Sequence, residues 1–298
     1  MGTKKINFDY FKVYGRWFER NENVEREGLF DLSPILEQAE NIEIPDRTYS
    51  FYNDSARLQN LGKRGDLWAL HFVRMRKDDS VSITTEDGDL DFLELEEGQY
   101  LGEEVSALYD PSNQVIMIQR NRYSLSPSGI AHYFNQAYNE PGLHIFLKPI
   151  VSPEALDRID SDDLFRGIEI SIADFKNATD DVKKTLTGLT RNIEETPDPV
   201  NVKIILSLDR KSKKSSSIKG IYDLLNKFSK DENVKKMEIR KKDDEESPVE
   251  KFDLIEDRLG DHAYFKIDRE NPLEHDKLIN KMIELYRGRK EYIDQITI

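Results

Sequence analysis

The residues with the clearest chemical potential are cations in a serine-rich segment. Arg210, Lys211, Lys213 and Lys214 lie in SLDRKSKKSSS, directly before a segment with the spacing of an amphipathic helix, and Lys219 follows. Lysine and arginine side chains, serine hydroxyls and the backbone N–H groups of a helix N-terminus all bind phosphate oxygens. This pattern predicts phosphate contacts, although a basic run taken alone is more often a solvated loop.

Charge is distributed unevenly along the chain. Residues 201–242 contain 13 Lys and Arg against 5 Asp and Glu, a balance of +8, whereas the whole chain has a formal net charge of −14. The remaining residues therefore carry −22, which is −14 less +8. This asymmetry disfavours binding of nucleic acid over the whole surface and favours one local basic face.

A second basic group precedes another predicted helix. Arg120 and Arg122 lie in QRNRYSLSPSG, where Ser126 and Pro127 supply an N-cap and a first-turn proline. We therefore predict that nucleic-acid phosphates contact Arg120, Arg122, Arg210, Lys211, Lys213, Lys214 and Lys219.

The sequence contains no complete motif for binding a metal ion or a nucleotide. Asp87, Asp89 and Asp91 match the first acidic positions of an EF-hand loop, but Phe92 stands where glycine is needed and Gly98 where glutamate is needed. We therefore expect a solvated hairpin turn. No GxGxxG or GxxxxGKS/T phosphate loop occurs, and the histidines are not spaced as metal ligands, so we expect no cofactor and no metal. The histidines are His71, His132, His144, His262 and His275.

Several protein classes are disfavoured by composition. The absence of cysteine excludes disulfides, thiolate zinc sites and a cysteine nucleophile. No apolar run approaches the ~18 residues of a membrane span, and the start lacks the apolar region of a signal peptide. We expect a cytoplasmic protein that does not enter the membrane.

The best-defined local structure surrounds Asp110-Pro111-Ser112-Asn113, whose residues are typical of a tight turn. The apolar run Val115–Ile118 predicts a return strand inside a sheet, and Ser126 begins a helix. A helix capped by Ser33 is predicted from Ser33 to Ala39. Further strands are predicted at Lys5–Tyr14, Arg47–Tyr52, Asp66–Arg76, which we expect to be central, and Leu143–Val151, with a hairpin of Val81–Thr85 and Leu90–Leu95.

The second half mixes strands and helices. Strands are predicted at Gly167–Ala173, Val200–Leu208, Val234–Lys242 and Ala263–Ile267, and helices after Ser152, at Asp181–Leu189, at 218–228 and from about Pro272. This order indicates an α+β protein. We predict two domains, each with a mostly antiparallel sheet and a few capped helices: a β-rich domain of residues 1–151, and a mixed domain of residues 152–298 with the basic segment and a terminal helix.

The order of segments resembles RexA-type phage-exclusion proteins and, more distantly, the KwaB component of the Kiwa anti-phage system. The resemblance spans LWALHFVRMR, GEEVSALYDPSNQVIMIQRNRYSLSPSGIAHYF and LHIFLKPIV, then IEISIA, VKIILSL and the basic second half. It implies a cytoplasmic, dimeric, DNA-binding protein of phage exclusion or defence, and it transfers no catalytic residue.

We therefore expect a non-enzymatic protein that binds DNA or RNA through residues 201–242. One alternative is a metal-dependent nuclease, for which Glu238-Ile239-Arg240 is only a partial match to the required Glu-x-Lys. Another is a protein that acts only on protein partners, as a defence subunit or as an acidic inhibitor. The apolar stripe Leu278, Ile279, Met282, Ile283 and Tyr286 can cover the chain's own core or form a homodimer interface, and we predict a homodimer.

Overall fold

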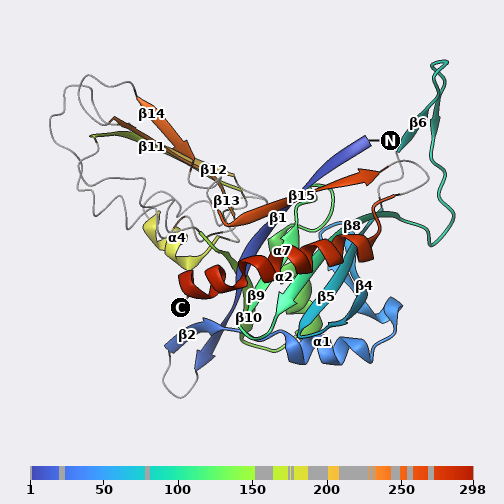
Figure 1. Cartoon of the computed structure of the whole chain (residues 1–298), viewed down its shortest axis with the longest axis horizontal. Coiled ribbons are helices and arrows are strands. Elements are labelled where there is room, and N and C mark those ends of the chain that lie inside the picture. The colour runs from blue at the N-terminus through green and yellow to red at the C-terminus, as the bar shows by residue number, and fades with distance from the viewer. Residues whose placement is uncertain are drawn as a thin grey trace. The chain divides into compact units, whose positions relative to one another are not determined.

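The computed structural model describes residues 2–19, 24–77, 81–151, 164–173, 175, 178–186, 201–207, 228, 231, 233–242, 249–253, 258–267 and 272–297 (Figure 1). Contacts divide the chain into two compact units. Unit 1 comprises Met1–Phe8, Lys12–Leu147 and Asp261–Lys290, and unit 2 comprises Asp9–Phe11, Lys148–Gly260 and Glu291–Ile298. The change of unit after Leu147 lies close to the predicted boundary at 151, but Asp261–Lys290, predicted within the second domain, groups with unit 1.

A nine-stranded sheet forms the centre of unit 1. Its strands follow the order β10-β1-β9-β8-β5-β4-β3, with β2 and β15 paired to β1. The pairs from β3 through β9 are antiparallel. The connections β3–β4, β4–β5 and β8–β9 are short, as is typical of antiparallel neighbours. The strands are β1 (Gly2–Glu19), β2 (Val24–Leu29), β3 (Thr48–Phe51), β4 (Asp54–Arg64), β5 (Leu67–Arg76), β8 (Leu101–Asp110), β9 (Val115–Gln119), β10 (Leu143–Pro149) and β15 (Gly260–Ile267).

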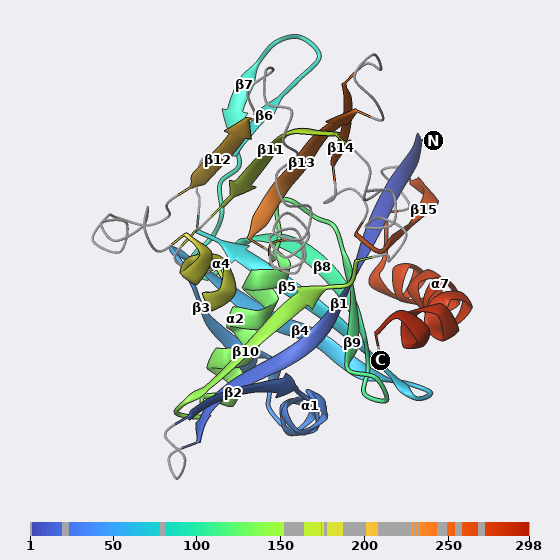
Figure 2. The same cartoon turned by 90° about the vertical axis from the view of Figure 1, so that its left-hand side faces the viewer.

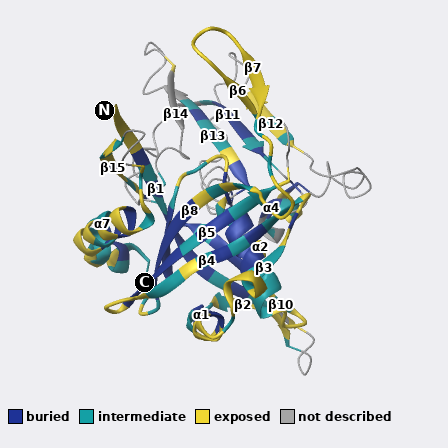
Figure 3. Cartoon of the chain, turned by 90° about the vertical axis from the view of Figure 1, so that its right-hand side faces the viewer, coloured by how far each residue is buried: buried dark blue, intermediate teal, exposed yellow. Residues whose placement is uncertain are grey.

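The middle strands of this sheet are buried on both faces (Figure 3). Trp68, Leu70 and Phe72 of β5 are buried, as are their neighbours Leu67 and Ala69, which point to the other face. The run Val115–Ile118 of β9 is likewise buried throughout. Strands covered on both faces need nearly continuous apolar sequence. The predicted central positions of both segments are confirmed.

Helices cover the two faces of the sheet within unit 1 (Figure 2). The ring of Phe72 on β5 lies 5.2 Å from the ring of Tyr133 on α2 (Pro127–Tyr138). The preceding residue, His71, stacks on His275 at the start of α7 (His275–Ile296). Because successive strand residues point to opposite faces, α2 and α7 lie on opposite sides of β5.

Of the two predicted serine caps that lie on described residues, one is correct. Ser126 Oγ accepts a hydrogen bond from Gly129 N at 3.2 Å and caps α2. The prediction for Ser33 is wrong because α1 (Ser33–Glu40) has Leu32 as its N-cap, and Ser33 is already helical. The Oδ1 atom of Asp31 accepts from Ser33 N at 2.9 Å, so an acidic residue outside the helix takes the role expected of the serine.

The apolar stripe of α7 packs on the chain's own core. Leu278, Ile279, Met282 and Tyr286 are each at most 2% exposed, and Ile283 is half-buried. The stripe therefore provides no open surface for a second copy. The helix begins at His275, three residues after the predicted start. Across the described parts of the chain, no helix is both long and apolar enough to cross a membrane.

Unit 2 contains a four-stranded antiparallel sheet in the order β12-β11-β13-β14. Its core cluster includes Ile168, Ile170 and Ile172 of β11 together with Val182 of α4. The predicted strands in this part are confirmed within a few residues. The helix expected after Ser152 and most of the one at 218–228 lie outside the described residues. The elements are β11 (Leu164–Ile172), α4 (Asp180–Thr185), β12 (Val202–Ser207), β13 (Val234–Lys242) and β14 (Glu250–Asp253).

The predicted acidic hairpin is confirmed as β6 (Ser82–Thr84) and β7 (Leu90–Phe92), which form a two-stranded sheet. Gly88 in its turn has a φ of +91°, a conformation that favours glycine. Nearly all residues of the hairpin are exposed (Figure 3).

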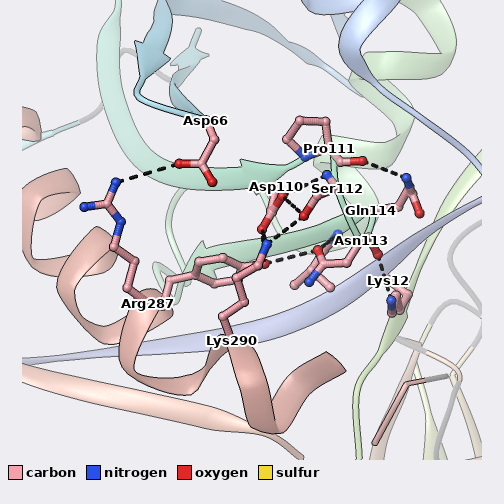
Figure 4. Close-up of polar contacts among 11 residues, drawn as sticks. Lys12, Asp66, Asp110, Pro111, Ser112, Asn113, Gln114, Arg287 and Lys290 are labelled. Carbon is pink, nitrogen blue, oxygen red and sulfur yellow. Dashed lines mark hydrogen bonds and ion pairs between the residues drawn. The ribbon is translucent and has the colours of Figure 1, made fainter. Parts of the chain in front are cut away.

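The turn between β8 and β9 is fixed by a buried polar cluster, here called the turn cluster (Figure 4). Asp110, at the end of β8, is 1% exposed. Its Oδ1 accepts from the backbone N and the Oγ of Ser112 at 2.8 and 2.6 Å. Its Oδ2 forms an ion pair with Lys290 Nζ and accepts from Tyr286 OH at 2.9 Å. The turn is therefore bound directly to α7.

Asn113 and Lys12 extend the turn cluster to the neighbouring strand. Lys12 Nζ on β1 donates to the backbone oxygen of Asn113 at 2.7 Å, and Asn113 Oδ1 accepts from Val115 N at 3.2 Å. Burial by itself raises the pKa of a carboxyl, but the hydrogen bonds from Lys290, Ser112 and Tyr286 outweigh it and hold the pKa of Asp110 below its ordinary value. Asp110 is therefore a charged group whose compensation depends on α7.

We predict that Asp110→Ala lowers the free energy of unfolding by about 3 kcal/mol, because Lys290 and Tyr286 lose a buried acceptor. Urea unfolding at neutral pH measures this change. The matched control is Asp66→Ala, since Asp66 is 70% exposed and lies 3.7 Å from Arg287 of α7. The control is expected to change stability by less than about 0.5 kcal/mol. Equal losses in the two variants would show that the turn cluster has no special role.

Candidate nucleic-acid interface

Two of the predicted phosphate contacts, Arg120 and Arg122, lie in the described structure. The remaining five lie outside the described residues and stay predictions. These five are Arg210, Lys211, Lys213, Lys214 and Lys219.

Strands β12 and β13, from the described part of the basic segment, flank β11 in the sheet of unit 2. Residues alternate between the two faces. One face carries the isoleucines of the core. The other, here called the charged face, carries Glu169 of β11, Lys203 of β12, and Lys236, Glu238 and Arg240 of β13.

The charged face is a connected network of ion pairs. Glu169 Oε1 lies 2.8 Å from Lys236 Nζ and 3.0 Å from Lys203 Nζ, and Glu169 Oε2 lies 3.4 Å from an Arg240 nitrogen. Glu238 lies directly opposite Glu169 in the ladder. It pairs with Lys236 at 3.1 Å and with Arg240 Nε at 2.8 Å. Three cations thus hold together two carboxylates that would otherwise repel one another.

This network shifts the ionisation of its members. Hydrogen bonds from Lys236 and Lys203 lower the pKa of Glu169 to about 2. The bonds to Glu169 and Glu238 raise the pKa of Lys236 above its ordinary value. Both partners are therefore fully charged near neutral pH.

The cations of the charged face are open to solvent, whereas its carboxylates are largely buried. The side chains of Lys203, Lys236 and Arg240 are 56%, 36% and 37% exposed, whereas those of Glu169 and Glu238 are 9% and 12% exposed. The carboxylates therefore lie beneath the cations and fix their positions. An outer layer of positioned cations is suited to contact an anion such as phosphate.

The nuclease alternative requires carboxylates that can hold a divalent metal. Glu169 and Glu238 face each other on adjacent strands, but their oxygens contact Lys203, Lys236 and Arg240. In the described ranges, no group of three or more His, Asp or Glu side chains is placed to bind a metal ion. The arrangement of these side chains favours anion binding over metal binding.

Arg122 and Tyr123 in unit 1 form an exposed pair before α2. The guanidinium carbon of Arg122 lies 4.6 Å from the centre of the Tyr123 ring, and Tyr123 is 50% exposed. Arg120 is exposed, and its backbone N donates to Asn7 O at 2.8 Å. The backbone N–H of Gly129 was one of the donors expected to contact phosphate, but it donates to the Ser126 hydroxyl. The loop retains two exposed cations and an aromatic ring.

Sequence reasoning missed the charged face. Glu169 was one charged residue within an otherwise apolar strand, and Lys203 is 34 positions away. The available signal was the alternation of Lys236, Glu238 and Arg240, which places three charges on one strand face. Only strand pairing shows that Glu169 is the common partner of Lys203, Lys236 and Arg240.

A second polar cluster in unit 1 involves two histidines. His71 and His275 stack with ring centres 4.4 Å apart and planes inclined by 7°. Ser106 Oγ lies 2.7 Å from His275 Nδ1, and His71 Nε2 lies 3.2 Å from Glu104 Oε2. Burial, followed by the charge of His71, lowers the pKa of His275 to about 4. This cluster attaches the first turn of α7 to β5 and β8.

We predict that His275 makes stability depend on pH between about 6.5 and about 4. The folded pKa is depressed, so the unfolded chain takes up the proton first, and stability is complete above about 6.5 and lost as pH falls. Thermal unfolding should show a smaller loss between about pH 7 and about pH 5 in His275→Gln than in the wild type. The control His262→Gln, at an exposed position, should retain the wild-type loss. An NMR titration midpoint for His275 near 6.5 would contradict this prediction.

Comparison with protein families matches residues 1–293 to a family described as a family of unknown function, DUF6731. The comparison with curated proteins gave no match. The match covers nearly the whole chain, including both units. The chain therefore belongs to the DUF6731 family.

Proposed function

We propose that the chain binds the phosphate backbone of nucleic acid through the charged face of unit 2 and the basic residues that follow β12 in sequence. The observation that carries the proposal is the exposure of Lys203, Lys236 and Arg240 on one sheet face. These residues belong to the segment 201–242, which carries +8 on a chain whose net charge is −14.

The carboxylates of the charged face determine the kind of binding we expect. Glu169 and Glu238 hold the cations in place but also compete with an incoming phosphate for them. Within the ion-pair network itself, three cations against two carboxylates leave a balance of +1. Binding should therefore be weak for each phosphate, sensitive to salt and largely independent of base sequence.

The proposed setting is bacterial phage exclusion or defence in the cytoplasm. Its support is the resemblance in segment order to RexA-type proteins and to KwaB, together with the absence of cysteine. On this proposal the chain acts by binding DNA or RNA and not by catalysis, either alone or with a companion defence protein.

We predict that affinity for duplex DNA or for RNA falls steeply with salt, with a log–log slope of about one unit for each phosphate neutralised. Lys203→Ala should lower both affinity and slope, because it removes the most exposed cation of the charged face. Fluorescence anisotropy titrations at several salt concentrations measure both quantities. The control Lys277→Ala, whose side chain is 58% exposed on α7, should bind like the wild type.

Failure to bind any nucleic acid at low salt would overturn the proposal. An equal effect of Lys203→Ala and Lys277→Ala would overturn the site. Metal-dependent nicking of plasmid DNA by the same preparation, abolished by a chelator, would support the nuclease alternative instead.

A substitution with the opposite effect gives a sharper test. Glu169→Gln removes the carboxylate that contacts Lys203, Lys236 and Arg240. We predict that this variant binds nucleic acid several-fold more tightly at low salt, because the competing anion is lost. Circular dichroism verifies that the variant is folded. Weaker binding by a folded Glu169→Gln protein would show that the carboxylate positions the cations more than it competes for them.

A further inference from the structure

We propose that strand β7 of one copy of the chain pairs with the outer edge of β12 in a second copy. The contact would extend the sheet of unit 2 with a strand supplied by the acidic hairpin. The contact needs no nucleic acid and does not rest on the proposed function, although both involve Lys203 of β12.

The hairpin leaves apolar side chains and strand edges uncovered. Leu90 and Phe92 on β7 are 66% and 58% exposed, and Ile83 on β6 is 50% exposed. Among the described strands, β6 and β7 pair only with each other. A two-stranded hairpin is marginally stable in water by itself, so a further strand would stabilise it.

Strand β12 has the properties of an acceptor edge. It ends the sheet order β12-β11-β13-β14, and no other described strand pairs with its outer side. Ile205 and Leu206 are 55% and 51% exposed. An exposed apolar edge strand is a ready template for strand addition, which joins backbone N–H and C=O groups.

The side-chain alternation of the two strands matches. On β12, Lys203 lies on the charged face and Leu206 on the core face. On the segment of β7, Asp89 and Asp91 alternate with Leu90 and Phe92. Pairing would therefore place the aspartates beside Lys203 and Ile205, which share the charged face, and Leu90 and Phe92 beside the exposed apolar side chain of Leu206.

Charge identifies the occupant as this chain itself. Residues 81–100 contain seven Asp and Glu and neither Lys nor Arg. A surface of this kind selects a basic partner, and residues 201–242, which include β12, carry +8. Each copy therefore offers both halves of the contact.

The test measures the mass of the full-length protein by size exclusion with light scattering, at low salt and over a concentration series, without nucleic acid. The wild type should exceed the 34.8 kDa of one chain as concentration rises. A double variant, Leu90→Ser with Phe92→Ser, should raise the dissociation constant by about tenfold or more. The control Tyr264→Ser removes a side chain that is 64% exposed on β15 and should leave the mass unchanged.

A charge exchange tests the pairing of the two strands. Asp91→Lys and Lys203→Glu should each weaken association several-fold, and the two together in one chain should restore it to within about twofold of the wild type. Circular dichroism establishes that each variant is folded. A wild type of one chain mass at every concentration would overturn the proposal, as would association unaffected by the Leu90 and Phe92 substitutions or a combined variant weaker than either single one.

Discussion

A charged carboxylate buried at the end of β8 constrains unit 1. Asp110 is shielded from water, so its charge must be compensated by groups close to it. Its compensating partners Tyr286 and Lys290 lie 176 and 180 positions later in the chain. The last helix must therefore return to the first part of the sheet. The same helix buries its apolar stripe there, so polar compensation and apolar burial require the same position of α7.

Helix α7 is attached to one face of the sheet by polar groups at two points. Ser106 and Asp110 lie on the same face of β8, four residues apart, and meet His275 and Tyr286. Apolar packing alone would allow the helix to slide or rotate, whereas hydrogen bonds at two points fix its register. The opposite face has a different arrangement, since Tyr109 OH donates to Asp31 at 2.9 Å and accepts from Leu32 N at 3.0 Å.

In unit 2 the paired charges lie on the exposed face of the sheet, whereas in unit 1 Asp110 is buried. The sheet of unit 2 buries one face and leaves the other to solvent, and Glu169 has a fixed charge at the centre of the exposed face. The side chains around it are long cations held by their ends, which lose less conformational freedom on binding an anion than free lysines would. A structural ion-pair network and an anion-binding surface are therefore compatible on the same strands.

Local patterns in the sequence predicted the segments with strong periodicity or turn chemistry. Local sequence predicted three features correctly, because neighbouring residues determine them: the Asp110–Asn113 turn, the buried strand β9 and the Ser126 cap. Three strands were missed: β2 and β14 are short and charged, and β4 has a register shift between Leu58 and Asn60 that interrupts its alternation. The partners of Asp110 and Glu169 could not be predicted, since each pairing joins residues brought together only by tertiary structure.

The same limit applies to the candidate interface. Composition indicated a basic segment, and the described strands give part of it a definite surface. Of the residues predicted to contact phosphate, Arg120 and Arg122 lie before α2, and the other five follow β12 in sequence, outside the described residues. The number of cations follows from the sequence, but the position of two carboxylates beneath them does not. Affinity depends on that balance, because only the charge left after internal pairing attracts phosphate.

The most direct test of the central claim is to locate bound nucleic acid on the chain. The full-length protein is irradiated with DNA and RNA that carry photoreactive bases, and the crosslinked peptides are identified by mass spectrometry. The account predicts that crosslinks concentrate within residues 201–242 and decrease as salt rises. Crosslinks confined to peptides outside that segment, or none at low salt, would contradict it.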